Sequence, residues 1–127
     1  MTMRDPGNAD SRRTSSLAQK LRDKAYRHSY VSQHLRTFLA DQVRSLRGEL
    51  SQKAFGKIIG KPQSVISRIE DNESDGMLSL QTLLDIASKL GIALVVRFVD
   101  YPNFIRITSD YSERALVPEP FTRILRH

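Results

Sequence analysis

Residues 52–69 read QKAFGKIIGKPQSVISRI, and this stretch decides the fold. Its apolar residues recur three and four positions apart on both sides of a short break, which is the spacing of two amphipathic helices. Gly60 stands at the break and tolerates the positive φ that a sharp turn between helices requires. Gly56 is small enough to let the two helices cross closely. The stretch therefore predicts two short helices joined by a three- to four-residue turn, the helix-turn-helix arrangement.

The two helices need apolar side chains that clamp them together. Phe55, Ile59, Ile66 and Ile69 have the spacing for this task. An ordinary helical hairpin would use the same clamp, so it stands as the alternative interpretation of these residues.

Two further helices are expected on either side of this pair. Residues 31–47 predict a long helix with one nearly apolar stripe that only Gln42 interrupts, and Gly48 ends it. Residues 80–90 predict another helix, which Ser79 caps and Gly91 closes. A polar loop over residues 71–76 precedes it.

The segment LSQKAFGKIIGKPQSVISRIEDN, residues 50–72, resembles the helix-turn-helix of the lambda-repressor-like family, also called the XRE family. Members typically carry Ser or Thr followed by Gln at the start of the second helix, Gly at the turn, and Ile or Leu followed by Glu at the end of the third. Ser51-Gln52, Gly60 and Ile69-Glu70 match that pattern. The resemblance covers about residues 31–90 and implies a four-helix DNA-binding domain.

The resemblance also implies how the domain docks on DNA. The third helix, about residues 62–71, would lie in the major groove with its outward side chains on base edges. Glutamine can address adenine, arginine guanine, and serine either base. The expected base contacts are Gln63, Ser64, Ser67 and Arg68, and the expected phosphate contacts are Ser51, Gln52, Lys57 and Lys61.

Several of these residues have a plainer interpretation. Lys57 is equally consistent with solvated surface, and Ser64 with support of the helix start. Arg68 has acidic neighbours at Glu73 and Asp75 with which it could pair. The residues alone also leave open whether Arg44 or Arg47 pairs with Glu70.

The charge of the chain is unevenly distributed. Residues 1–69 hold 14 Lys and Arg against 5 Asp and Glu, whereas residues 70–127 hold 6 against 9. The positive surplus therefore lies in the half that contains the helix-turn-helix pattern. Such asymmetry favours a polyanion partner, most simply double-stranded DNA, although a merely solvated basic surface would give the same count.

Other classes of protein are disfavoured by what the chain lacks. It has no cysteine, which excludes disulfides and thiolate metal sites. No apolar run reaches the roughly 20 residues that span a membrane, and residues 1–20 are too polar for a secretory signal. No cluster of catalytic residues stands out. We therefore expect no enzyme activity, no cofactor, no metal and no membrane association, and a cytoplasmic, nucleoid-associated location.

After residue 91 the apolar pattern changes. Residues 92–99 and 104–108 are rich in β-formers, with a turn at 101–103 between them. This predicts a C-terminal β-hairpin or dimerising strands, because an isolated hairpin is marginal in water and a second copy of the chain would cover it. The alternative is a hairpin folded back on its own helices.

The whole sequence thus predicts a mostly α fold in four parts. These are a disordered tail (1–16), a helical DNA-binding domain (17–91), a β element for dimerisation (92–108) and an irregular tail (109–127). The expected function is that of a sequence-specific, homodimeric transcriptional regulator, most simply a repressor. The alternative function is an antitoxin that binds a toxin protein and regulates its own operon.

Overall fold

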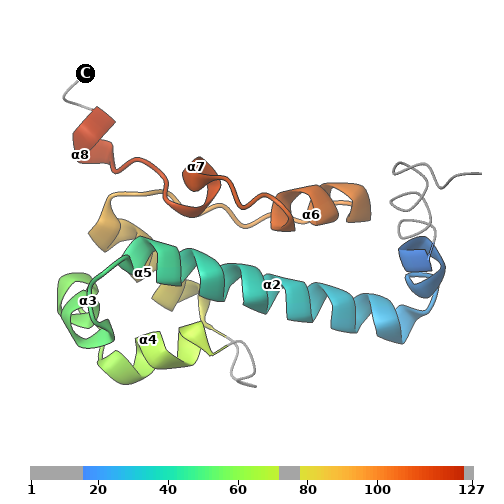
Figure 1. Cartoon of the computed structure of the whole chain (residues 1–127), viewed down its shortest axis with the longest axis horizontal. Coiled ribbons are helices and arrows are strands. Elements are labelled where there is room, and N and C mark those ends of the chain that lie inside the picture. The colour runs from blue at the N-terminus through green and yellow to red at the C-terminus, as the bar shows by residue number, and fades with distance from the viewer. Residues whose placement is uncertain (1–15, 72–77, 125–127) are drawn as a thin grey trace, which may run out of the picture. The chain divides into compact units, whose positions relative to one another are not determined.

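The fold is all-helical in the computed structural model, which describes residues 16–71 and 78–124. The predicted tail at 1–16 lies outside the described residues except for Ser16, and the predicted polar loop does so except for Asp71. A helical turn at 16–20 comes first (Figure 1). The helices that follow are α2 (Lys24–Arg47), α3 (Gln52–Ile59), α4 (Gln63–Glu70), α5 (Leu80–Leu90), α6 (Tyr101–Thr108), α7 (Glu113–Leu116) and α8 (Phe121–Ile124).

The chain divides into two compact units, residues 1–34 and 35–127. In the first, the guanidinium of Arg27 donates to the carbonyl oxygens of Leu21 and Arg22 at 2.9 and 3.1 Å, which ties the preceding turn to the start of α2. Rings at four-residue spacing follow on one side of the helix. Tyr30 lies 6.3 Å from Tyr26 and 3.9 Å from His34, measured between ring centroids.

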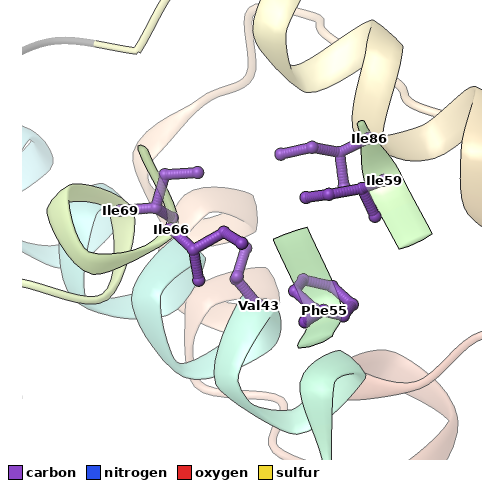
Figure 2. Close-up of a cluster of buried hydrophobic side chains, with 6 residues drawn as sticks. All are labelled: Val43, Phe55, Ile59, Ile66, Ile69 and Ile86. Carbon is purple, nitrogen blue, oxygen red and sulfur yellow. The ribbon is translucent and has the colours of Figure 1, made fainter. Parts of the chain in front are cut away.

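The second unit is built around six buried apolar side chains. They come from α2, α3, α4 and α5 and point toward one another (Figure 2): Val43, Phe55, Ile59, Ile66, Ile69 and Ile86. Phe55, Ile59 and Ile66 are less than 2% exposed. Burial of each such side chain stabilises the fold by about 1.5–3 kcal/mol. The predicted clamp residues are therefore the core of the domain.

Helix ends match the sequence at several points. The hydroxyl oxygens of Ser51 and Ser79 accept hydrogen bonds from the backbone N–H groups of Ala54 and Thr82, at 3.0 and 3.1 Å. Gly60 ends α3 with φ at +70°. Pro62, expected in the first turn of the next helix, is instead the residue that precedes α4.

The backbone of α3 lies very close to the following turn and to α4 at Gly56. A Cβ atom added there would lie 2.5 Å from the carbonyl oxygen of Lys61 and 3.1 Å from Cδ1 of Ile66. The first of these neighbours is backbone, which cannot move aside without unwinding the turn. The predicted need for a small residue at this position is confirmed.

The predicted β-hairpin at 92–108 is wrong. Residues 101–108 form the helix α6, and residues 92–100 have no regular secondary structure, so this part of the described chain contains no strand. Asp100 decides the outcome, because its carboxylate accepts a hydrogen bond from the backbone N–H of Asn103 at 2.9 Å and so caps a helix. Pro102 then falls in the first turn, where it costs no hydrogen bond. Capping thus outweighs the β propensity of residues 104–108.

The C-terminal segment contains two further short helices, α7 and α8, where the sequence predicted an irregular tail. It is held against α2 by specific contacts. The hydroxyl of Tyr111 donates to a carboxylate oxygen of Asp41 at 2.7 Å, and the amide of Gln42 donates to the carbonyl of Ala115 at 3.1 Å. Gln42, the one polar residue in the stripe of α2, therefore has a structural partner.

We predict that Gly56→Ala destabilises the second unit by about 2 kcal/mol or more, because the new methyl group overlaps backbone that cannot relax. Urea-induced unfolding followed by circular dichroism measures this. Gly48→Ala is the matched control, since Gly48 has a φ of +60° but nothing within 4 Å of the added carbon. The control should cost only about 1 kcal/mol, the strain of positive φ alone. Equal losses would contradict a steric role for Gly56.

Candidate nucleic-acid interface

α3 and α4 are joined by a turn that two hydrogen bonds close. The backbone N–H groups of Gly60 and Lys61 both reach the carbonyl oxygen of Gly56, the second at 2.9 Å. With the close approach at Gly56, this turn sets the angle at which α4 leaves α3. The side chains of α4 are therefore positioned by this rigid turn.

α4 has two chemically different sides. Ile66 and Ile69 are buried in the core, and Val65 is half-buried. The opposite side is exposed and carries the four side chains predicted to contact bases: Gln63, Ser64, Ser67 and Arg68. The predicted base-contacting residues thus share one solvent-facing surface, which we call the α4 face. The acidic neighbours proposed for Arg68, Glu73 and Asp75, lie outside the described residues.

The predicted phosphate contacts divide into two groups. Ser51 and Lys57 are exposed. Gln52 is half-buried, and its amide donates to a carboxylate oxygen of Glu70 at 3.3 Å. The ammonium of Lys61 pairs with the carboxylate of Asp85 at 2.7 Å. Gln52 and Lys61 therefore already have partners within the chain.

A buried carboxylate joins three helices beside the α4 face. Two nitrogens of the Arg47 guanidinium donate to the two carboxylate oxygens of Glu70, each at 2.8 Å. Arg44 adds a hydrogen bond to the backbone carbonyl of Glu70 at 3.0 Å, and its Nε lies 3.7 Å from the carboxylate. Both arginines thus engage Glu70, with Arg47 as the bidentate partner. Together with Gln52, this set forms what we call the Glu70 network, which links α2, α3 and α4.

Comparison with known proteins agrees with this geometry. A family model described as helix-turn-helix matches residues 43–96. These residues contain the Gly56 crossing, the turn and α4. Residues 43–96 therefore carry a DNA-binding helix-turn-helix domain like that of lambda-repressor-like (XRE) regulators. Neither the curated proteins nor the solved structures gave a match.

The helix-turn-helix domain also presents surface residues that the sequence analysis did not single out. Lys53 and Ile58 are exposed on α3, Ile58 by 51%. Lys53 follows Gln52 directly, so the sequence alone could have placed it in the first turn of α3. The Lys61–Asp85 pair gave no such signal, because the two residues are 24 positions apart and meet only through the fold.

The ionisation of Glu70 reflects its position in the domain. Burial of the carboxylate raises its pKa. Hydrogen bonds from Arg47 and Gln52, together with the charges of Arg47 and Arg44, lower the pKa by more than burial raises it, so the pKa of Glu70 lies below the ordinary 4.5. The hydrogen bond to Glu70 likewise raises the pKa of Arg47. Both groups are therefore held in their charged forms.

The parts of the chain that the structure describes offer neither a metal-ion cluster nor a membrane-spanning helix. There, no three His, Asp or Glu side chains gather closely enough to hold a metal ion. None of the described helices combines the length and the apolar character that crossing a membrane requires.

We predict that Glu70→Gln lowers the free energy of unfolding at pH 7 by about 2–3 kcal/mol, because hydrogen bonds to a charged partner are lost. The folded-state pKa of Glu70 lies below the unfolded value, so its stabilisation is present above about pH 4.5 and is lost as the pH falls through the folded pKa. The difference between the two proteins should therefore shrink as the pH falls below about 4.5. Urea titrations at pH 7 and pH 3 measure it.

Asp85→Asn is the matched control for that experiment. It also removes a carboxylate that accepts a hydrogen bond from a cation, but in a pair that is only partly buried. We expect it to change stability much less than Glu70→Gln. A loss of equal size for both variants at pH 7 would contradict a joining role for Glu70.

Proposed function

We propose that the domain binds double-stranded DNA sequence-specifically as a homodimeric repressor, with the α4 face in the major groove. The observation that carries this proposal is the division of α4 into a buried apolar side and an exposed polar side. An α-helix fits the major groove, and its outward amides and guanidinium groups can hydrogen-bond base edges there. Gln63 and Arg68 supply those two groups.

Positioning on the duplex would come from phosphate contacts around this face. Ser51 and Lys57 are exposed near it along the chain. Pro62 precedes α4 without giving a side-chain cap, so the first N–H groups of the helix are open to a phosphate oxygen. Lys61 and Gln52 would take part through the donors that Asp85 and Glu70 leave unused, since an ammonium group has three and an amide nitrogen two.

A single short helix reads few base pairs, so specificity requires a second one. A homodimer presents two copies of α4 to half-sites about one DNA turn apart, which is how dimeric helix-turn-helix proteins reach useful affinity. A protein seated in the groove of a promoter also excludes other proteins from that site. Repression is therefore the simplest outcome of binding.

We predict that Gln63→Ala and Arg68→Ala each weaken binding to the preferred duplex by about 1–3 kcal/mol and relax base preference at one position of each half-site. Selection from a random duplex pool identifies the preferred sequence, and fluorescence anisotropy then gives the affinities. Arg106→Ala, on α6, removes the same charge as Arg68→Ala and should leave base preference unchanged. Unchanged affinity and selectivity in both α4 variants would refute the proposed face.

Lys57→Ala should act differently from the α4 variants. Loss of one phosphate contact weakens binding to all sequences alike and lowers the slope of log K against log salt concentration by about 1. Anisotropy titrations at several salt concentrations, with preferred and scrambled duplexes, measure this slope. A salt slope equal to that of the unaltered protein would assign Lys57 to solvated surface instead.

A further inference from the structure

We infer that residues 93–99, Ala-Leu-Val-Val-Arg-Phe-Val, form a β-strand that pairs antiparallel with the same residues of a second copy. The inference rests on the proposed function in that it gives the homodimer its interface. It replaces the predicted hairpin by a single strand from each subunit, because residues 101–108 belong to α6.

The segment exposes more apolar surface than its neighbours. Val95 is 75% exposed, Val96 is 70% exposed and Phe98 is fully exposed. All three residue types are strong β-formers. The backbone is equally available, because none of the hydrogen bonds within the described chain involves the N–H or C=O groups of residues 93–99. An exposed apolar segment whose backbone groups are unbonded can pair with a strand of another chain.

The limits of the available strand are set by bonds at its two ends. The N–H of Ile92 is already bonded to the carbonyl of Ala87 at 3.0 Å, in the cap that ends α5. At the other end, the carboxylate of Asp100 caps α6. The free stretch therefore runs over residues 93–99, and its middle residue is Val96.

A two-fold axis at Val96 gives a favourable set of cross-strand neighbours. Leu94 then faces Phe98 of the second copy, an aliphatic–aromatic pair, and Arg97 lays its aliphatic stem beside Val95. A shift of the axis by one residue, to Arg97, would place two guanidinium groups directly opposite each other, which is destabilising. Charge therefore disfavours the register shifted toward Arg97, and the limits of the free stretch, residues 93–99, favour an axis at Val96 over one at Val95.

Self-pairing also explains why the partner is a second copy and not an unrelated chain. A two-fold interface must be complementary to itself, and the only charged residue in the segment avoids its own copy in the centred register. The same two-fold relation would set two α4 helices against two half-sites of one duplex. A different protein partner on this segment would leave the domain with a single recognition helix.

A cysteine scan tests the pairing directly, because the natural chain contains no cysteine. Single substitutions to Cys at residues 94–98 of the full chain are oxidised, and disulfide-linked dimers are separated at twice the 14.5 kDa chain mass. Residues directly opposite each other lie about 4.5–5.5 Å apart between Cα atoms, within disulfide range. Diagonal neighbours, which are displaced along the strand from the directly opposite position, lie about 7–8 Å apart, at or beyond the limit of the disulfide range.

We expect cross-linking to peak sharply at Val96→Cys and to fall to the level of Ser88→Cys at the other positions. Ser88 is exposed on α5 and serves as the control for random collision. Cross-linking at the control level at all five positions would overturn the inference and would assign the segment to another occupant, such as a different protein.

A second variant keeps this test separate from the test of DNA binding. Val96→Asp places two carboxylates opposite each other and should convert the protein from dimer to monomer in sedimentation, with the helical circular dichroism unchanged. Val117→Asp, also at an exposed valine, should leave the dimer intact. A dimer that persists in Val96→Asp overturns the strand interface even if the protein binds DNA.

The two proposals then fail in different ways. If the α4 variants lose half-site binding while position 96 does not cross-link, the DNA-binding proposal stands and the strand pairing falls. If position 96 cross-links but the α4 variants bind as the unaltered protein does, the strand pairing stands and the assigned DNA face falls.

Discussion

The bidentate pair between Arg47 and Glu70 is the interaction on which the arrangement of this domain depends. Glu70 is the last residue of α4, Arg47 is the last of α2, and Gln52 is the first of α3, so one carboxylate fixes three helix ends. Arg47 also donates to the carbonyl of Leu50 at 2.7 Å, which closes the short junction between α2 and α3. A buried carboxylate left without these partners would cost more than an apolar residue at the same place.

This anchoring works together with the apolar core to make α4 a rigid element. The Glu70 network holds one end of α4, and the turn closed on the carbonyl of Gly56 holds the other. Ile66, fully buried, fixes the rotation of α4 about its axis. Base recognition requires such preorganisation, because hydrogen bonds to base edges tolerate little displacement of the side chains that make them. The orientation of the α4 face is therefore a consequence of packing on its opposite side.

The sequence predicted the parts of this fold that local chemistry determines. Gly56, Gly60 and the serine caps have roles set by nearby backbone, and the core clamp follows from helical spacing; all were predicted and are present. The exposed residues of α4 followed from the same spacing. The partners of Gln52 and Lys61 could not be predicted, because Glu70 and Asp85 are 18 and 24 residues away and meet them only after folding. Residues 104–108 were misjudged because alternation within five residues fits a strand as well as a helix, and the capping carboxylate of Asp100 decided between the two.

The central claim is that the α4 face contacts base edges. Backbone amide NMR shifts of the full chain, recorded with the selected duplex and with a scrambled duplex of equal length, test it most directly. The account predicts large shifts at Gln63, Ser64, Ser67 and Arg68 that depend on DNA sequence, and small or sequence-independent shifts on α6. Sequence-dependent shifts confined to other elements, with α4 unaffected, would contradict it.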